Sequence, residues 1–279
     1  MIPAPFDYVR AESAEEAIEL IGQHGDEAKF LAGGHSLIPL MKLRLAQPTV
    51  LVDIGRLEDL SYVRDDGATV AIGALTRHMD IEQSPLVAEH LPLLAEAASH
   101  VGDPQVRHRG TIGGSIAHAD AASDLPATTL ALGASYVAAG PAGRREIPAD
   151  EFFHGFLTTA LAPDEILVEI RIPKMAGAGW SFQKFTRRAQ DWAIVGVAAW
   201  VRDGDAGPES GVGLVNMGSV PLLAVGTSGA LAEGATVDEA AALAHEGCDP
   251  TGDLNASVDY RNHLARTLTK RALVAATTN

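Results

Sequence analysis

The chain of 279 residues contains a single cysteine, Cys248. An intrachain disulfide, an iron–sulfur cluster held by cysteines and a zinc site of several cysteines all require more thiols than one. These kinds of site are therefore excluded from this chain. If the protein takes part in redox chemistry, it must use a cofactor that it binds by other means.

Basic residues and long apolar runs are also scarce. The chain has 21 lysines and arginines against 36 acidic residues, which gives a formal net charge of −15. No basic stripe is available to neutralise phosphates, so we do not expect a nucleic-acid partner. No run of about 20 apolar residues occurs, and the N-terminus lacks a basic segment followed by an apolar one. We therefore expect a cytoplasmic protein that is not an integral membrane protein.

Two stretches with paired glycines stand out in this otherwise ordinary composition. The first spans Lys29–Ser36 and reads KFLAGGHS, and the second spans Gly110–Ser115 and reads GTIGGS. Glycine lets the backbone come close to a ligand, and successive N–H groups form a concave site for phosphate oxygens. In the first stretch Ser36 is also suited to cap a following helix. Two such turns together suit a dinucleotide, although each pair also fits a simple tight turn. Neither reads G-x-G-x-x-G, so we do not predict a Rossmann NAD site.

The residues around the first glycine pair predict a βαβ unit. We expect a strand at 28–32, a helix at 37–45 and a second strand at 49–54. The two strands of such a unit are parallel, which places the glycine turn at the carboxyl end of a strand.

The remaining patterns predict mixed α and β structure. In the middle of the chain we expect an amphipathic helix at 86–100, a strand at 105–112 leading into the second glycine turn, a helix at 124–132, and strands at 60–64, 68–73, 135–139, 144–147 and 165–172. After the Gly/Ala stretch 176–179 we expect a polar loop at 203–210, strands at 180–186, 194–201 and 211–217, and helices at 237–245 and 258–275. Strands followed by helices suggest a separate α+β unit.

The two glycine stretches carry a resemblance to a known family. AGGHS at 32–36 and TIGGS at 111–115 resemble the two FAD-binding signatures of the FAD-binding (medium) subunits of molybdenum hydroxylases. The resemblance is greatest to the medium subunits of the aerobic carbon monoxide dehydrogenase type. It extends to Ile2–Tyr8, Leu37–Lys42 and Asp103–Arg107, and so covers nearly the whole chain.

The resemblance implies a fold and a domain organisation. The fold is a two-part FAD-binding unit of the vanillyl-alcohol-oxidase type, followed by a small C-terminal α+β domain. We accordingly expect an N-terminal βαβ subdomain at 1–55, a second FAD-binding subdomain at 56–177 and a C-terminal flavoprotein domain at 178–279.

The same resemblance implies which residues contact FAD. The stretch at 29–36 and the stretch at 111–114 would hold the pyrophosphate, with Ser115 at a position where many members have Asn. Asp124 matches a ribose contact, although it also fits a helix N-cap. Lys184 matches a lysine near the flavin ring, and Trp192 an aromatic residue beside it. Leu167 matches an apolar position that contacts the cofactor through its backbone. The alternatives are that Lys184 is an exposed lysine and that Trp192 and Leu167 are core residues. The full set is Lys29, Phe30, Leu31, Ala32, Gly33, Gly34, His35, Ser36, Val101, Thr111, Ile112, Gly113, Gly114, Ser115, Asp124, Leu167, Lys184 and Trp192.

The family also implies partners that hold the remaining cofactors. A large molybdopterin subunit would oxidise the substrate, and a small [2Fe–2S] subunit would relay electrons to FAD on this chain. The implied assembly is a dimer of heterotrimers. FAD would pass the electrons to an external acceptor, through which the complex could meet the inner face of the membrane. No metal site and no catalytic group other than the flavin is expected here. Carbon monoxide, an N-heterocycle and an aldehyde all stay open as substrates.

Two other readings of the glycine stretches stay open. In some stand-alone flavin oxidases a similar Gly-Gly-His stretch links FAD covalently to the histidine, which would here be His35. A non-enzymatic nucleotide-binding module is the other possibility. It would show neither flavin nor electron transfer.

Overall fold

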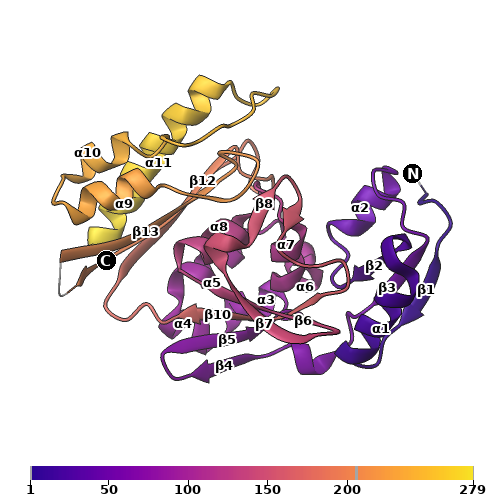
Figure 1. Ribbon diagram of the computed structural model, residues 1–279. Coiled ribbons are helices and arrows are strands. Elements are labelled where there is room, and N and C mark those ends of the chain that lie inside the picture. Colours follow the sequence, from indigo (N-terminus) through magenta and orange to yellow (C-terminus); the bar gives the residue numbers. More distant parts are fainter. Residues whose placement is uncertain (1, 205–206, 279) are drawn as a thin grey trace.

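The computed structural model describes residues 2–204 and 207–278, which form three successive units, each with its own sheet. The middle unit lies between the other two (Figure 1). The N-terminal sheet has the order β1-β3-β2 and is entirely parallel. Its elements are β1 (Asp7–Arg10), α1 (Ala14–His24), β2 (Ala28–Leu31), α2 (Leu37–Lys42) and β3 (Val50–Asp53). This confirms the predicted βαβ unit, and β2 ends two residues before the first glycine pair.

The middle unit is an antiparallel sheet with helices gathered on one side (Figure 1). The strand order is β4-β5-β10-β6-β7. Its strands are β4 (Val63–Asp66), β5 (Thr69–Gly73), β6 (Ser135–Gly140), β7 (Gly143–Pro148) and β10 (Ile166–Pro173), with a separate pair β8 (Phe153–Gly155) and β9 (Thr158–Thr159). Its helices are α3 (His78–Gln83), α4 (Pro85–His90), α5 (Pro92–Ser99), α6 (Pro104–Arg109), α7 (Ile112–His118) and α8 (Asp124–Ala131).

The C-terminal unit is a four-stranded antiparallel sheet in the order β11-β12-β13-β14. Its elements are β11 (Gly179–Phe185), β12 (Val195–Gly204), β13 (Gly207–Val215), β14 (Leu222–Leu223), α9 (Val225–Ala232), α10 (Val237–Ala242) and α11 (Val258–Thr278). Helix α11 packs on one face of the sheet, and α8 of the middle unit packs on the other. Because α8 lies between two units, all eight of its residues are buried.

Two predicted elements in the middle unit are wrong. Pro92 divides the predicted helix at 86–100 into α4 and α5, because proline cannot supply the N–H that a continuous helix needs. The predicted strand at 105–112 is instead α6. Asp103 begins this helix by accepting hydrogen bonds from the N–H groups of Gln105 and Val106, at 2.8 and 3.0 Å, and Pro104 occupies its first turn.

One prediction in the C-terminal unit also fails. Most of the predicted polar loop at 203–210 belongs to the long hairpin of β12 and β13, where Asp203 pairs with Pro208 and Gly204 with Gly207. Residues 205 and 206 lie outside the described part of the chain. Polar residues here do not mark a loop, because the end of this hairpin extends into solvent beyond the core.

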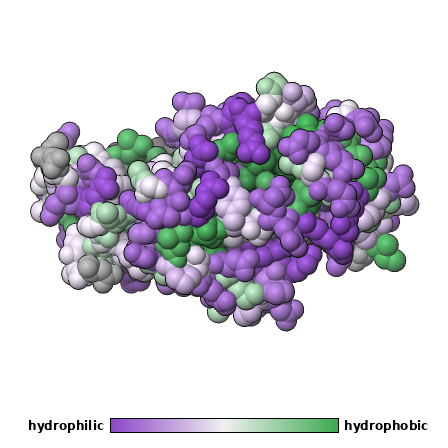
Figure 2. Space-filling model, turned by 90° about the horizontal axis from the view of Figure 1, so that it is seen from below, coloured by the Kyte–Doolittle hydropathy of each residue, from purple (hydrophilic) through white to green (hydrophobic). Residues whose placement is uncertain are grey.

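The hydrophobic cores join neighbouring units. The core under the N-terminal sheet includes Val137 and Ile166 from the middle sheet, and the middle core includes Phe182 and Ala198 from the C-terminal sheet. On the face seen in Figure 2, hydrophilic residues predominate and hydrophobic ones form small groups between them. Among the described helices, none is long and apolar enough to cross a membrane.

Candidate functional site

The two glycine stretches lie in direct contact through Gly33 and Gly110, which are 77 positions apart in the chain. A Cβ atom placed on Gly33 would lie 2.3 Å from the carbonyl oxygen of Arg109 and 2.9 Å from the Cα of Gly110. The Arg77 guanidinium donates to the same Arg109 carbonyl and, at 3.3 Å, to the carbonyl of Gly55. Gly33 is therefore required for the packing of one stretch on the other. The space that a side chain at position 33 would need is occupied by the backbone of Arg109 and Gly110.

The second glycine pair lies in the first turn of α7 and does not form a turn after a strand. Thr111 is the N-cap of α7, and its Oγ1 accepts a hydrogen bond from the N–H of Gly114 at 3.1 Å. The N–H of Gly113 donates to the carbonyl of Ala74 at 2.8 Å. This stretch is thus held firmly against the segment that follows β5.

The first glycine stretch has backbone donors to spare. Within residues 2–204 and 207–278, no hydrogen bond uses the N–H groups of Gly33, Gly34, His35 or Ser36. Gly34 has a φ of 75°, a left-handed conformation that glycine adopts without strain. Ser36 occupies the N-cap position of α2, but its side chain makes no capping bond, so its predicted capping role is wrong. Consecutive unused N–H groups in such a loop form a site for an anion.

A cavity of about 840 Å³ opens between the glycine stretches, the start of α8 and the loop before β12. Its size suits a large cofactor. Fifteen of the eighteen predicted site residues line it: Lys29, Phe30, Ala32, Gly33, Gly34, His35, Ser36, Val101, Thr111, Gly113, Gly114, Ser115, Asp124, Leu167 and Trp192.

Three predicted site residues do not line this cavity. Ile112 is fully buried in the core of the middle unit. Leu31 ends β2, where its carbonyl accepts a hydrogen bond from the N–H of Ile54 at 3.0 Å. Lys184 does not line the cavity but forms an ion pair with Asp124, which does.

Asp124 and Lys184 form a buried ion pair at the edge of the cavity. The Lys184 Nζ donates to Asp124 Oδ2 at 2.6 Å and to the carbonyl of His100 at 2.9 Å, and both side chains are only 4% exposed. Burial raises the pKa of Asp124 to about 6, against the lowering effect of the Lys184 ammonium. Asp124 Oδ1 is buried and has no hydrogen-bond partner among the residues that the structure describes. The alternatives are wrong: Ser123 is the N-cap of α8, and Lys184 is not exposed.

Trp192 and Leu167, two further predicted residues that line the cavity, differ in burial. Trp192 is 70% exposed and lines the cavity, so the alternative that places it in the core is wrong. Leu167 is buried in β10, where it belongs to the core and also lines the cavity.

The cavity also contains residues that the sequence did not single out. His78, at the start of α3, is buried against Gly110, and its Nδ1 has no hydrogen-bond partner. His118 ends α7, and Asp120 lies two residues further along the chain. Further lining residues come from the segment between β8 and β10 and from the loop before Trp192, namely Leu157, Thr158, Thr159, Leu161, Gln190 and Asp191. No motif marks these residues, because only the tertiary packing brings them to the cavity.

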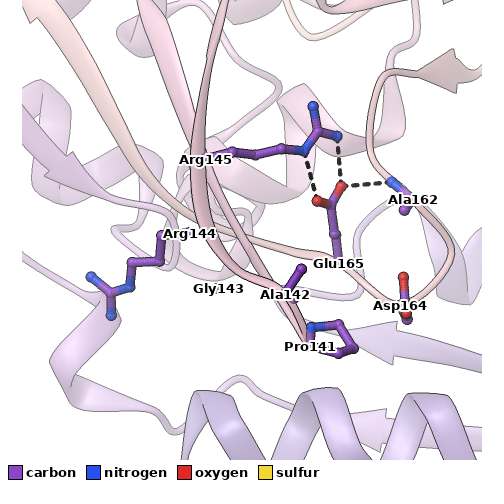
Figure 3. Close-up of a pocket in the computed structure, with 9 residues that line it drawn as sticks. Pro141, Ala142, Gly143, Arg144, Arg145, Ala162, Asp164 and Glu165 are labelled. Atoms are coloured by element: carbon purple, nitrogen blue, oxygen red, sulfur yellow. Dashed lines mark hydrogen bonds and ion pairs between the residues drawn. The ribbon is translucent and has the colours of Figure 1, made fainter.

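A smaller cavity of about 280 Å³ lies beside the turn between β6 and β7 (Figure 3). The Arg145 guanidinium faces Glu165 and donates to both of its carboxylate oxygens at 2.7 Å, while Arg144 points away. Glu165 also accepts a hydrogen bond from the N–H of Ala162 at 2.7 Å. Arg145 and Glu165 therefore satisfy one another at the wall of this cavity, which indicates a structural role for the pair.

The residues that line the large cavity fit a dinucleotide cofactor. It combines unused backbone donors at Gly33–Ser36 for phosphate oxygens with an unpaired carboxylate oxygen at Asp124 for a hydroxyl donor. Among the described residues, no cluster of three or more His, Cys, Asp or Glu side chains is arranged to hold a metal ion.

Comparisons with known proteins agree with this geometry. Residues 4–175 match the FAD binding domain in molybdopterin dehydrogenase, and residues 180–276 match the CO dehydrogenase flavoprotein C-terminal domain. The carbon monoxide dehydrogenase medium chain of Hydrogenophaga pseudoflava is 45% identical over 282 residues, which cover 99% of this chain and 98% of that protein. The alpha subunit of the 6-hydroxypseudooxynicotine dehydrogenase complex of Paenarthrobacter nicotinovorans is 40% identical over 290 residues, covering 99% and 96%.

A solved structure is equally similar. It is carbon monoxide dehydrogenase from Hydrogenophaga pseudoflava in a form that lacks the Mo-pyranopterin moiety, with a TM-score of 0.96, 46% identity and coverage of 100% of this chain and 99% of that one. The chain belongs to the family of FAD-binding subunits of molybdenum hydroxylases. It is a medium subunit of the carbon monoxide dehydrogenase type, an oxidoreductase subunit whose cofactor is FAD.

Proposed function

We propose that this chain carries electrons between a [2Fe–2S] subunit and an external acceptor, while a molybdopterin subunit oxidises the substrate. The observation that carries the proposal is the 840 Å³ cavity, which is lined by Gly33–Ser36, with their unused N–H groups, and by Asp124, with its unpaired Oδ1. When bound there, FAD supplies the redox chemistry, and the protein binds and orients it. The single cysteine supports placing the iron–sulfur clusters on another chain.

We assign parts of the cavity to parts of the cofactor. The N–H groups of Gly33–Ser36 and the start of α7 hold the pyrophosphate, for which backbone donors are suited. Asp124 Oδ1 accepts a hydrogen bond from a ribose hydroxyl, and Lys184 keeps this carboxylate ionised and in place. Trp192, which is exposed and lines the cavity, lies beside the flavin ring.

The substrate of the complex is set by the molybdenum subunit in this proposal. Two relatives of similar identity, 45% and 40%, are named after different substrates, carbon monoxide and 6-hydroxypseudooxynicotine. A flavin subunit that handles only electrons is compatible with either. We keep a dimer of heterotrimers, a cytoplasmic location and domains at 1–55, 56–177 and 178–279 as parts of the proposal. The domain bounds are supported by the sheets, because no sheet has strands in more than one of the three ranges.

The test begins with a visible absorption spectrum of the purified chain before and after addition of FAD. Acid precipitation then separates flavin that is bound non-covalently, which is released, from flavin that is attached covalently, which stays with the protein. We expect flavin bands with all FAD released into the supernatant. Flavin that stays in the pellet would instead favour the oxidase with FAD linked to His35, and no flavin after FAD addition would favour the non-enzymatic module.

Electron transfer is tested separately in the assembled complex. The chain is co-expressed with the molybdopterin and [2Fe–2S] subunits, and each candidate substrate is added without oxygen while the flavin absorbance is followed. Bleaching of the flavin that requires the [2Fe–2S] subunit is the expected result. Bleaching that proceeds without this subunit would contradict the proposed route.

A further inference from the structure

His78 lies on the wall of the large cavity, where the two glycine stretches meet. The residue is 4% exposed, and its backbone N–H donates to the carbonyl of Gly110 at 3.1 Å. A Cβ atom placed on Gly110 would lie 2.6 Å from His78 Cδ2 and 2.7 Å from His78 Nε2. The Cδ2–Nε2 edge of the ring therefore rests on Gly110, which itself lines the cavity. The ring fills the space that a side chain at position 110 would need.

The two ring nitrogens of His78 have different surroundings. Nδ1 is completely buried and has no hydrogen-bond partner among the described residues, whereas Nε2 lies on the edge next to Gly110. A buried N–H without an acceptor is costly, so the neutral ring carries its proton on Nε2. Burial lowers the pKa of His78 to about 4, with a further lowering from His35, Arg77 and Arg107, and the ring is therefore neutral at physiological pH. His78 thus presents one N–H donor, at Nε2.

The charges around His78 favour an anionic acceptor for this donor. Arg77 lies next to it and holds the Arg109 and Gly55 carbonyls, and His35 lies in the first glycine stretch. The nearby Arg107 pairs with Glu82, with 2.8 Å between Arg107 Nε and the carboxylate oxygen. The unused N–H groups of Gly33–Ser36 belong to the same cavity. The part of a dinucleotide that suits these surroundings is its pyrophosphate.

We propose that His78 binds the pyrophosphate of the cofactor by donating a hydrogen bond from Nε2, and that Gly110 is glycine because this imidazole occupies the space beside it. The inference rests on the proposed function for the location of FAD. It adds a side-chain donor to a phosphate site that otherwise consists of backbone N–H groups.

The test compares His78→Phe with His78→Gln. Phenylalanine keeps a planar ring but has no donor, whereas the glutamine amide nitrogen can take the place of Nε2. We expect His78→Phe to bind FAD about tenfold or more weakly, the range for a hydrogen bond to a charged group, and His78→Gln to recover most of the affinity. Ile81→Val is the matched control, since Ile81 is buried in the same helix but does not line the cavity. Wild-type affinity in His78→Phe, or equal losses in both His78 variants, would overturn the inference.

Two spectroscopic measurements on wild-type protein complete the test. Nitrogen-15 NMR of labelled histidine reports the tautomer of His78, which we expect to be protonated at Nε2 and not at Nδ1. Phosphorus-31 NMR of bound FAD should show a shifted pyrophosphate resonance in His78→Gln relative to wild type, and an unshifted one in Ile81→Val. A proton on Nδ1, or no shift in His78→Gln, would contradict the inference even if His78→Phe failed to fold. Failure of wild-type protein to bind FAD would instead reject the proposed function.

Discussion

Lys184 Nζ lies 2.6 Å from Asp124 Oδ2, and this buried ion pair joins β11 of the C-terminal unit to α8 of the middle unit. The same ammonium donates to the carbonyl of His100, just after α5. Three elements therefore meet at one lysine at the edge of the cavity. The arrangement leaves Asp124 Oδ1 free of any partner within the described chain. A ligand hydroxyl that donates to this oxygen would complete the hydrogen bonding of the pair.

Lys184→Met should destabilise the protein in a pH-dependent way. Removal of one partner leaves a buried charge uncompensated, which costs about 3–5 kcal/mol. The pKa of Asp124, already raised to about 6 by burial, should rise further without the ammonium. A carboxyl with a raised folded pKa stabilises the fold below its unfolded pKa of about 3.9 and loses that contribution as pH rises through the folded pKa. We therefore expect the deficit of Lys184→Met to be larger at pH 8 than at pH 5.

Urea unfolding of the FAD-free protein at the two pH values measures this difference. Lys174→Met is the matched control, because Lys174 forms an ion pair of similar length with Asp65, at 2.7 Å, on the surface. Exposed pairs contribute little, so the control should unfold nearly as wild type does at both pH values. An equal deficit of Lys184→Met at pH 5 and pH 8 would mean that ionisation of Asp124 is not its cause.

Gly33→Ala should separate the two glycine stretches. The added Cβ would lie 2.3 Å from the Arg109 carbonyl oxygen, which is backbone and cannot rotate away. We expect a loss of about 1–3 kcal/mol in unfolding free energy and FAD binding weakened by about tenfold or more. The loss of stability and the weaker FAD binding would both result from displacement of the second stretch, and neither depends on the orientation of the ligand.

Gly22→Ala provides the control for Gly33→Ala. Gly22 lies inside α1, and a Cβ there would meet no atom within 4 Å. Alanine favours a helix over glycine by about 0.5–1 kcal/mol, so this variant should be as stable as wild type or more so. Unfolding curves and FAD titrations of the two variants measure the changes in stability and in FAD affinity. Gly33→Ala with wild-type FAD affinity would show that close packing of the stretches is unnecessary for the site.

Local patterns in the sequence predicted much of this fold. The βαβ unit at the start of the chain follows from two short apolar runs separated by a glycine turn and a helix, and its strands are parallel as expected. The hairpin of β4 and β5 follows from alternating residues around Asp65-Asp66-Gly67. Such features depend on residues close together in the chain. Helix α6 was also marked locally, by Asp103-Pro104, but the strand prediction did not take this start signal into account.

The contacts that shape the site depend on residues far apart in the chain. Asp124 and Lys184 are 60 positions apart, and nothing in either stretch indicates that α8 would be enclosed between two sheets. The glycine motif predicted that the first stretch belongs to the site. It did not predict that the backbone of Arg109 packs against Gly33. His78 had no motif at all. Burial and pairing of this kind arise only when separate units pack together.

Cys248 should react slowly with thiol reagents in the native protein. It is half-buried, and burial raises the pKa of its thiol to about 11. Since the thiolate is the reactive form, only about one molecule in a thousand would carry it at pH 8. The rate of alkylation at pH 8 is measured by mass spectrometry for protein in native buffer and for protein unfolded in urea. Modification at the same rate in both would mean that the thiol is not protected, whereas slow native labelling agrees with a cysteine that takes no part in electron transfer.

Trp192→Ala should change the bound flavin without changing the stability of the fold. The side chain is 70% exposed, so its removal should alter the unfolding free energy by no more than about 0.5 kcal/mol. If the indole lies beside the flavin ring, as proposed, its loss should brighten the fluorescence of bound FAD and speed its dissociation, because a stacked aromatic neighbour is removed. Fluorescence lifetimes and stopped-flow release of FAD measure both effects.

Trp200→Phe is the reciprocal control. The Trp200 Nε1 donates to the carbonyl of Ala131 at 2.7 Å, at the contact between β12 and α8, and Trp200 does not line the cavity. Loss of this bond leaves a backbone acceptor without its partner, so we expect a cost of about 1–3 kcal/mol in stability with unchanged flavin fluorescence. The two tryptophans should therefore separate stability from flavin contact. If the fluorescence and the release rate of FAD are unchanged in Trp192→Ala, the flavin ring does not lie beside Trp192.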